Sequence, residues 1–110
     1  MDVITDKHDI ELTIDKTYSN FEDFYSENKY GIFVGFLELF YEMENIPEQD
    51  MFSLIINWKI NDSNVHTEYQ YDRSAINMLT DFLLPYFEQL EEYEMCSEIK
   101  ELYTRLHEIK

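Results

Sequence analysis

The spacing of apolar residues predicts three β-strands along the chain. In residues 9–15, apolar and polar side chains alternate, which is the period of a strand with one buried face. Residues 51–60 and 65–71 show the same alternation on either side of the polar segment 61–64, whose residue types favour a turn. The second and third strands are therefore predicted to form a β-hairpin.

Apolar residues at helical spacing predict a helical region over residues 20–45. The segment Asn28-Lys29-Tyr30-Gly31 offers a possible break, so this region is either one long bent helix or a short helix followed by a longer one. Gly31 and Gly35 are four residues apart, a spacing that also suits close packing of a helix against a neighbour. Pro47 ends the helix in either case, because proline lacks the amide hydrogen that would continue it.

The last third of the sequence predicts two further helices. Asp72 or Ser74 can cap the first of them, and Pro85 within its apolar stripe predicts a kink. The second carries its apolar residues on one face, and a turn near residues 91–95 would join the two as a C-terminal helical hairpin. The order is then β-α-β-β-α-α. We expect residues 1–110 to form a single α+β domain, with helices packed on one face or at one end of a small three-stranded antiparallel sheet.

Charge restricts the partners that such a domain can bind. The chain has 24 acidic and 8 basic residues, which gives a net charge of −16 at pH 7. Residues 51–71 are nearly neutral, so the negative field comes from the rest of the chain. Because this field repels nucleic acid and anionic membranes, we expect neither as a direct partner and expect a basic protein surface instead. Solubility alone is the alternative explanation of the acidity.

The sequence contains no recognisable catalytic or metal-binding motif. Cys96 lies three residues before Ile99 on an apolar helix stripe, which favours a buried, inert thiol. The three histidines are scattered, and His66 shares a strand face with Glu68, which would supply half of a metal site. We therefore expect a protein that is not an enzyme and has no cofactor and no metal. An unorthodox carboxylate site is the remaining catalytic alternative.

The candidate partner-binding residues lie between residues 88 and 101. Carboxylates one helical turn apart repel each other by about 0.2–0.5 kcal/mol, yet the sequence repeats such pairs here. Tyrosine among carboxylates is typical of an interface that receives lysine and arginine. A solvated helix face, with the aromatic side chains turned inward, is the alternative. The candidate residues are Glu88, Glu91, Glu92, Tyr93, Glu94, Glu98 and Glu101.

Cysteine content and hydropathy indicate the compartment. Cys96 is the single cysteine and has no partner for an internal disulfide, which fits a reducing cytoplasm. The first residues lack the apolar core of an export signal. The most apolar stretch, residues 30–41, is shorter than the roughly 20 residues that a membrane span needs. We therefore expect a soluble, cytoplasmic protein without contact with the membrane.

The predicted turn between the C-terminal helices has a distinctive order of residues. Glu92-Tyr93-Glu94 is an acidic-aromatic turn, Cys96-Ser97 is a pair of small residues, and Lys100-Glu101 is a basic-acidic pair. This order, over about residues 90–109, resembles the UVR motif, a short helical hairpin in which the last pair is usually arginine and aspartate. In that family the hairpin mediates protein–protein contact, and this is what the resemblance implies here.

Two functions fit these features. The first is a non-enzymatic acidic protein that masks a basic surface, such as an immunity or inhibitor protein acting on a toxin or a nucleic-acid enzyme. The second is an adaptor or self-associating module that acts through its C-terminal helical hairpin and forms a homodimer. Binding to a basic partner should weaken steeply with salt, because salt screens exposed charges.

Overall fold

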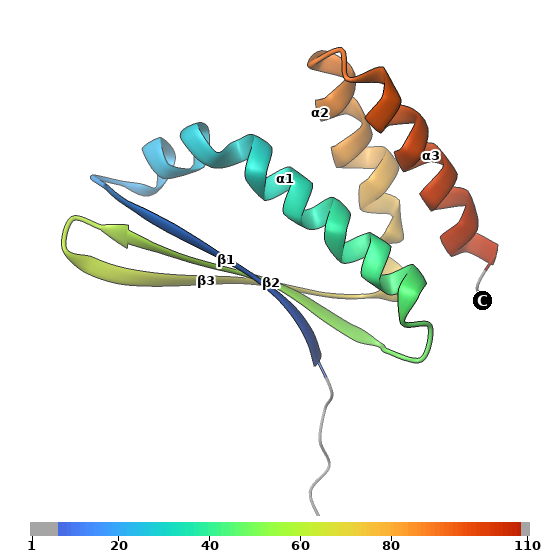
Figure 1. The fold of residues 1–110 in the computed structure, drawn as a ribbon, viewed down its shortest axis with the longest axis horizontal. Coiled ribbons are helices and arrows are strands. Elements are labelled where there is room, and N and C mark those ends of the chain that lie inside the picture. The colour runs from blue at the N-terminus through green and yellow to red at the C-terminus, as the bar shows by residue number, and fades with distance from the viewer. Residues whose placement is uncertain (1–6, 109–110) are drawn as a thin grey trace, which may run out of the picture.

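Three strands and three α-helices follow the predicted order β-α-β-β-α-α in residues 7–108, the part of the chain that the computed structural model describes (Figure 1). A 3-10 turn, η1, and a π-helical turn, η2, precede the second helix. The elements are β1 (Lys7–Tyr18), α1 (Phe21–Asn45), β2 (Met51–Ile60), β3 (Ser63–Asp72), η1 (Arg73–Asn77), η2 (Leu79–Leu83), α2 (Leu84–Gln89) and α3 (Tyr93–Glu108). The α+β class and the predicted hairpin of β2 and β3 are confirmed.

The sheet is mixed, with the strand order β1-β2-β3. β2 and β3 are antiparallel, as predicted, but β1 runs parallel to β2, so the prediction of a fully antiparallel sheet does not hold for β1. The reason lies in α1, whose 25 residues carry the chain back along the sheet so that β2 begins beside the start of β1. Parallel neighbours need such a crossover connection, whereas a short turn joins antiparallel ones.

One face of the sheet is covered by helices. α1 lies across this face, and α2 and α3 pack beyond it (Figure 1). On this side of the central strand β2, four apolar side chains are buried, and their alternation is the one that predicted the strand. They are Phe52, Leu54, Ile56 and Trp58. The opposite face of the sheet carries no helix from residues 7–108 and is lined mainly by polar side chains.

α1 is one continuous helix, which settles the alternative left open for residues 20–45. The Asn20 side chain caps its start by accepting a hydrogen bond of 2.9 Å from the amide of Asp23. At Gly35 the helix packs closely against the sheet, because a Cβ atom there would lie 3.1 Å from Leu54 Cδ1. Gly31 is exposed and does not break the helix. None of the helices in the described range is both long and apolar enough to cross a bilayer.

Arg73 fixes the end of α1. Its guanidinium donates three hydrogen bonds, of 2.6–2.9 Å, to main-chain carbonyl groups at and beyond the last turn of that helix, and it lies 5.5 Å from the centre of the Phe52 ring. The last carbonyl groups of a helix have no amide partner within that helix, and the partly buried Arg73 side chain supplies donors there. The three acceptors are the oxygens of Met43, Ile46 and Gln49.

The segment from Arg73 to Gln89 is helical but irregular. Asp72 caps it, because its side chain accepts a hydrogen bond of 2.9 Å from the amide of Ser74. The irregularity expected from Pro85 is a π-helical turn directly before it, in which the Leu84 amide donates to the carbonyl of Leu79. A widened turn of this kind is a common cause of a bend in a helix.

The turn between α2 and α3 places Glu91 in the left-handed region, at φ 58°. The Glu91 amide donates to the Glu88 carbonyl at 3.0 Å, and the Glu92 amide donates to the Phe87 carbonyl at 3.1 Å. This pair of bonds is a Schellman motif, in which the left-handed position usually holds glycine because other residues are strained there. The tight turn predicted between these helices is present, and α3 begins at Tyr93.

The two glycines of α1 should respond differently to substitution. Gly31→Ala is expected to raise the free energy of unfolding by about 0.5–1 kcal/mol, since alanine favours the helix and its Cβ would meet no atom within 4 Å. Gly35→Leu is expected to lower it by about 1–3 kcal/mol, because the new side chain displaces Leu54 and Leu12. Denaturant unfolding measures both variants, and a stable Gly35→Leu protein would contradict the close packing at this position.

The strain at Glu91 predicts that Glu91→Gly stabilises the protein by about 0.5–1 kcal/mol. Glu91→Gln is the matched control, because it removes the charge and keeps the strained backbone. Thermal and denaturant unfolding of both variants provide the measurement. If Glu91→Gln stabilised as much as Glu91→Gly, repulsion between carboxylates rather than backbone strain would limit stability at this turn.

Candidate functional site

Most of the candidate binding residues gather at the turn between α2 and α3. They line a shallow hollow of about 350 Å³, together with Met95, and we call this region the acidic turn site. Its members from the candidate set are Glu91, Glu92, Tyr93, Glu94 and Glu98. Tyr93 is 65% exposed and is the most exposed large apolar side chain in the described part of the chain. The site thus presents an aromatic ring surrounded by carboxylates.

The other two candidates lie outside this hollow. Glu88 is exposed on α2, close enough to Cys96 that its charge adds to the raised pKa of that thiol, whose main cause is burial. Glu101 lies further along α3. Burial is the main cause of the raised pKa of Tyr41, and the charge of Glu101 adds to it. The turn between α2 and α3 therefore brings five of the seven candidate residues together, and the other two lie on α2 and α3.

Glu92 connects the acidic turn site to α1. Its Oε1 accepts a hydrogen bond of 3.0 Å from the Tyr30 hydroxyl, and this bond is the main reason that the pKa of Tyr30 lies above its usual value. Its Oε2 is buried and has no hydrogen-bond partner among the residues that the structure describes. A buried acceptor that lacks a donor costs stability, so this oxygen is an unsatisfied group at the edge of the acidic turn site.

Two carboxylate groups, Glu27 and Asp72, have a pKa below the usual value. The pKa of Glu27 is lowered by the hydrogen bond from Lys16, and the pKa of Asp72 is lowered by the hydrogen bond from Ser74. A general acid at neutral pH needs the opposite shift. In residues 7–108, histidine, cysteine and carboxylate side chains form no group of three that could hold a metal ion.

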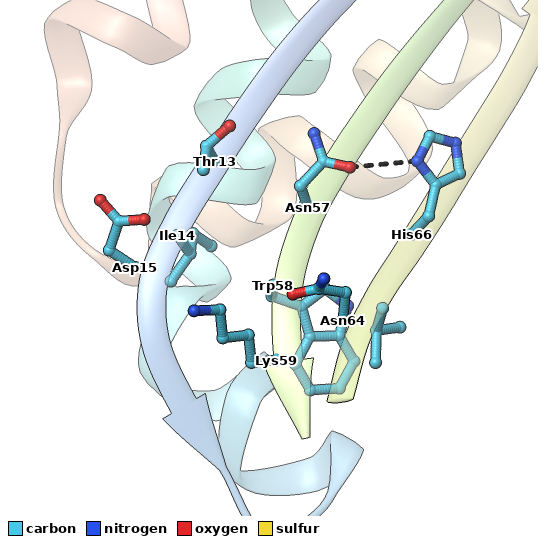
Figure 2. A pocket seen from close by; sticks show the side chains of 9 residues that line it. Thr13, Ile14, Asp15, Asn57, Trp58, Lys59, Asn64 and His66 are labelled. Carbon is cyan, nitrogen blue, oxygen red and sulfur yellow. Dashed lines mark hydrogen bonds between the residues drawn. The ribbon is translucent and has the colours of Figure 1, made fainter. Parts of the chain in front are cut away.

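A second hollow, of about 330 Å³, opens where β1 loses its register with β2 between Thr13 and Thr17 (Figure 2). Lys59 extends from β2 toward β1, and His66 Nδ1 on β3 lies 3.0 Å from Asn57 Oδ1. His66 Nε2 is 4.0 Å from Glu68, whose other oxygen accepts a hydrogen bond from Ser53. His66 and Glu68 thus share one strand face, as expected from the sequence, and the hollow mixes donors, acceptors and both signs of charge.

A third hollow is almost entirely apolar, and we call it the aromatic groove. It has a volume of about 330 Å³ and lies between α1, β3 and η2. Phe82, on η2, is 59% exposed beside it. The lining residues are Tyr25, Phe33, Phe36, Tyr69, Tyr71, Met78, Phe82 and Leu83.

The C-terminal helical hairpin exists, and the residues that resemble the UVR motif occupy its turn and second helix. Glu92 directly precedes α3, Tyr93 and Glu94 open that helix, and Lys100 is exposed further along it. Cys96 is buried in the core with a free thiol. Protein–protein contact through this hairpin, which the resemblance implies, stays a prediction. Comparison of the chain with protein-family models, with curated proteins and with solved structures found no match.

Proposed function

We propose that this protein binds a basic surface of another protein, and that the acidic turn site is part of its contact face. One observation carries the proposal: an exposed tyrosine, Tyr93, stands among exposed carboxylates on a molecule with a net charge of −16. Aromatic rings supply contact area in protein interfaces, and complementary charge speeds association.

The role that fits this chemistry is an immunity or inhibitor protein. Enzymes that act on nucleic acids need a basic surface to hold phosphates, and an acidic protein can compete for that surface. A direct nucleic-acid ligand is disfavoured, because the same field repels phosphate. The buried, unpaired thiol of Cys96 is consistent with a reducing compartment, and we propose a cytoplasmic location.

Self-association through the C-terminal hairpin is the second candidate, and the exposure of Tyr93 beside a hollow at the turn favours it. The two candidates respond to salt in opposite ways. Binding of a basic partner weakens as salt screens the attraction, whereas two copies of a strongly negative chain associate better when salt screens their repulsion. Sedimentation at low and high salt distinguishes them.

Charge removal at the acidic turn site provides the test. The triple variant Glu91→Gln, Glu94→Gln, Glu98→Gln should bind lysine- and arginine-rich peptides about tenfold more weakly than the natural chain, with a smaller dependence on salt. Calorimetric titration at several salt concentrations measures both quantities.

The matched control removes three charges elsewhere. Glu48→Gln, Asp50→Asn and Asp62→Asn change exposed residues in the connections that precede and follow β2. The affinity of this control for the same peptides should fall by no more than about threefold, because only the net charge has changed. Equal losses in the two triple variants, or binding that is indifferent to salt, would refute the acidic turn site as the contact face.

A further inference from the structure

The aromatic groove is built so that a large side chain can enter it from the edge of the sheet. Tyr69 and Tyr71 of β3 turn toward α1, and their ring centres lie 5.2 and 5.9 Å from that of Phe36. Burial raises the pKa of both tyrosines, so their rings are partly removed from water. Phe82 of η2 and Met78, which directly precedes η2, also line the groove. These side chains leave an apolar space that is open to solvent.

A cation lies beside two rings of the groove wall, Tyr25 and Phe33. Lys29 Nζ lies 5.7, 5.7 and 5.3 Å from the ring centres of Tyr25, Phe33 and Tyr86, within the range of cation–π attraction. Lys29 itself is not among the residues that line the groove. Cation–π attraction thus acts on one wall of the groove from a side chain that does not occupy the groove.

The groove borders the free edge of the sheet. β3 pairs with β2 on one side, and on its other side it has no neighbouring strand in residues 7–108. An extended peptide can pair with such an edge through its main chain while alternate side chains enter adjacent pockets. Because Tyr69 and Tyr71 are alternate residues on the helix side of β3, a paired segment would direct a side chain into the groove.

Charge decides which extended segment fits. A second copy of this chain would bring another net charge of −16 to the same edge, which opposes pairing between copies. Two exposed carboxylates stand close along the chain to groove residues, because Glu22 is one helical turn before Tyr25 and Asp81 directly precedes Phe82. Lys29, beside Tyr25 and Phe33, is a cation near the same wall. These carboxylates favour a segment that carries lysine or arginine on either side of its apolar residue.

We propose that the aromatic groove and the β3 edge together bind an extended, lysine- or arginine-rich segment of the partner, with one large apolar side chain of that segment in the groove. This proposal rests on the proposed function and names the chemistry of the partner more closely. The carboxylates attract the segment, and the groove supplies the apolar anchor that fixes it.

Two synthetic peptides test the groove. Both are about ten residues of alternating lysine and threonine; one has a central phenylalanine and the other a central serine. The phenylalanine peptide should bind the natural chain about tenfold more tightly. In NMR titrations it should shift the amide signals of Tyr69, Gln70 and Tyr71, whereas the serine peptide should leave them nearly unchanged.

A matched pair of variants checks that the gain comes from the groove. Phe82→Ser should abolish the advantage of the phenylalanine peptide, whereas Leu90→Ser, which changes a 45% exposed side chain outside the groove, should retain it. Equal affinity of the two peptides for the natural chain, or an advantage that survives Phe82→Ser, would overturn the groove proposal. Failure of the serine peptide to bind at low salt would count instead against the proposed function.

Discussion

The packing of α1 along the central strand β2 is the contact on which the rest of the structure depends. Gly35 lets the helix lie close to Leu54, and near the start of the helix the rings of Phe24 and Trp58 stack with their centres 3.9 Å apart. Burial of apolar side chains at such an interface is the main favourable contribution to folding. Since the parallel pairing of β1 requires α1 as its crossover, the strand order follows from the same contact.

Polar contacts hold both ends of α1. Near its start, Glu27 accepts hydrogen bonds from Tyr18 and Lys16, which tie the helix to the end of β1. At its other end, Arg73 donates to the carbonyl groups of Met43, Ile46 and Gln49. With α1 fixed over the sheet, the C-terminal helices pack beyond it, and the acidic turn site and the aromatic groove both lie on the helical side of the molecule.

The sequence was sufficient for the elements whose signals are local. The alternation in residues 51–60 and the polar turn after it predict the hairpin, because both depend on neighbouring residues alone. The direction of β1 could not be read in the same way, since it depends on whether the intervening helix lies back along the sheet. The register shift between Thr13 and Thr17 also has no local signal, so the hollow at that position was missed.

The candidate site was predictable only in part, for the same reason. The acidic run is visible in the sequence, and the turn at Glu91 gathers five of its seven residues around one hollow. The aromatic groove was missed because its rings come from α1, β3 and η2, which only the tertiary fold brings together. Arg73 was missed for a related reason: a lone arginine in a sequence gives no indication of which carbonyl groups it will reach.

Hydrogen–deuterium exchange of the natural chain with and without a lysine-rich polypeptide tests most directly whether the helical side is the binding face. Protection should increase in residues 69–82 and 88–98, which contain the groove edge and the acidic turn site. The opposite face of the sheet also carries carboxylates, including Glu11, so it is the alternative binding face. Protection confined to residues 9–15 and 53–66 would contradict the account.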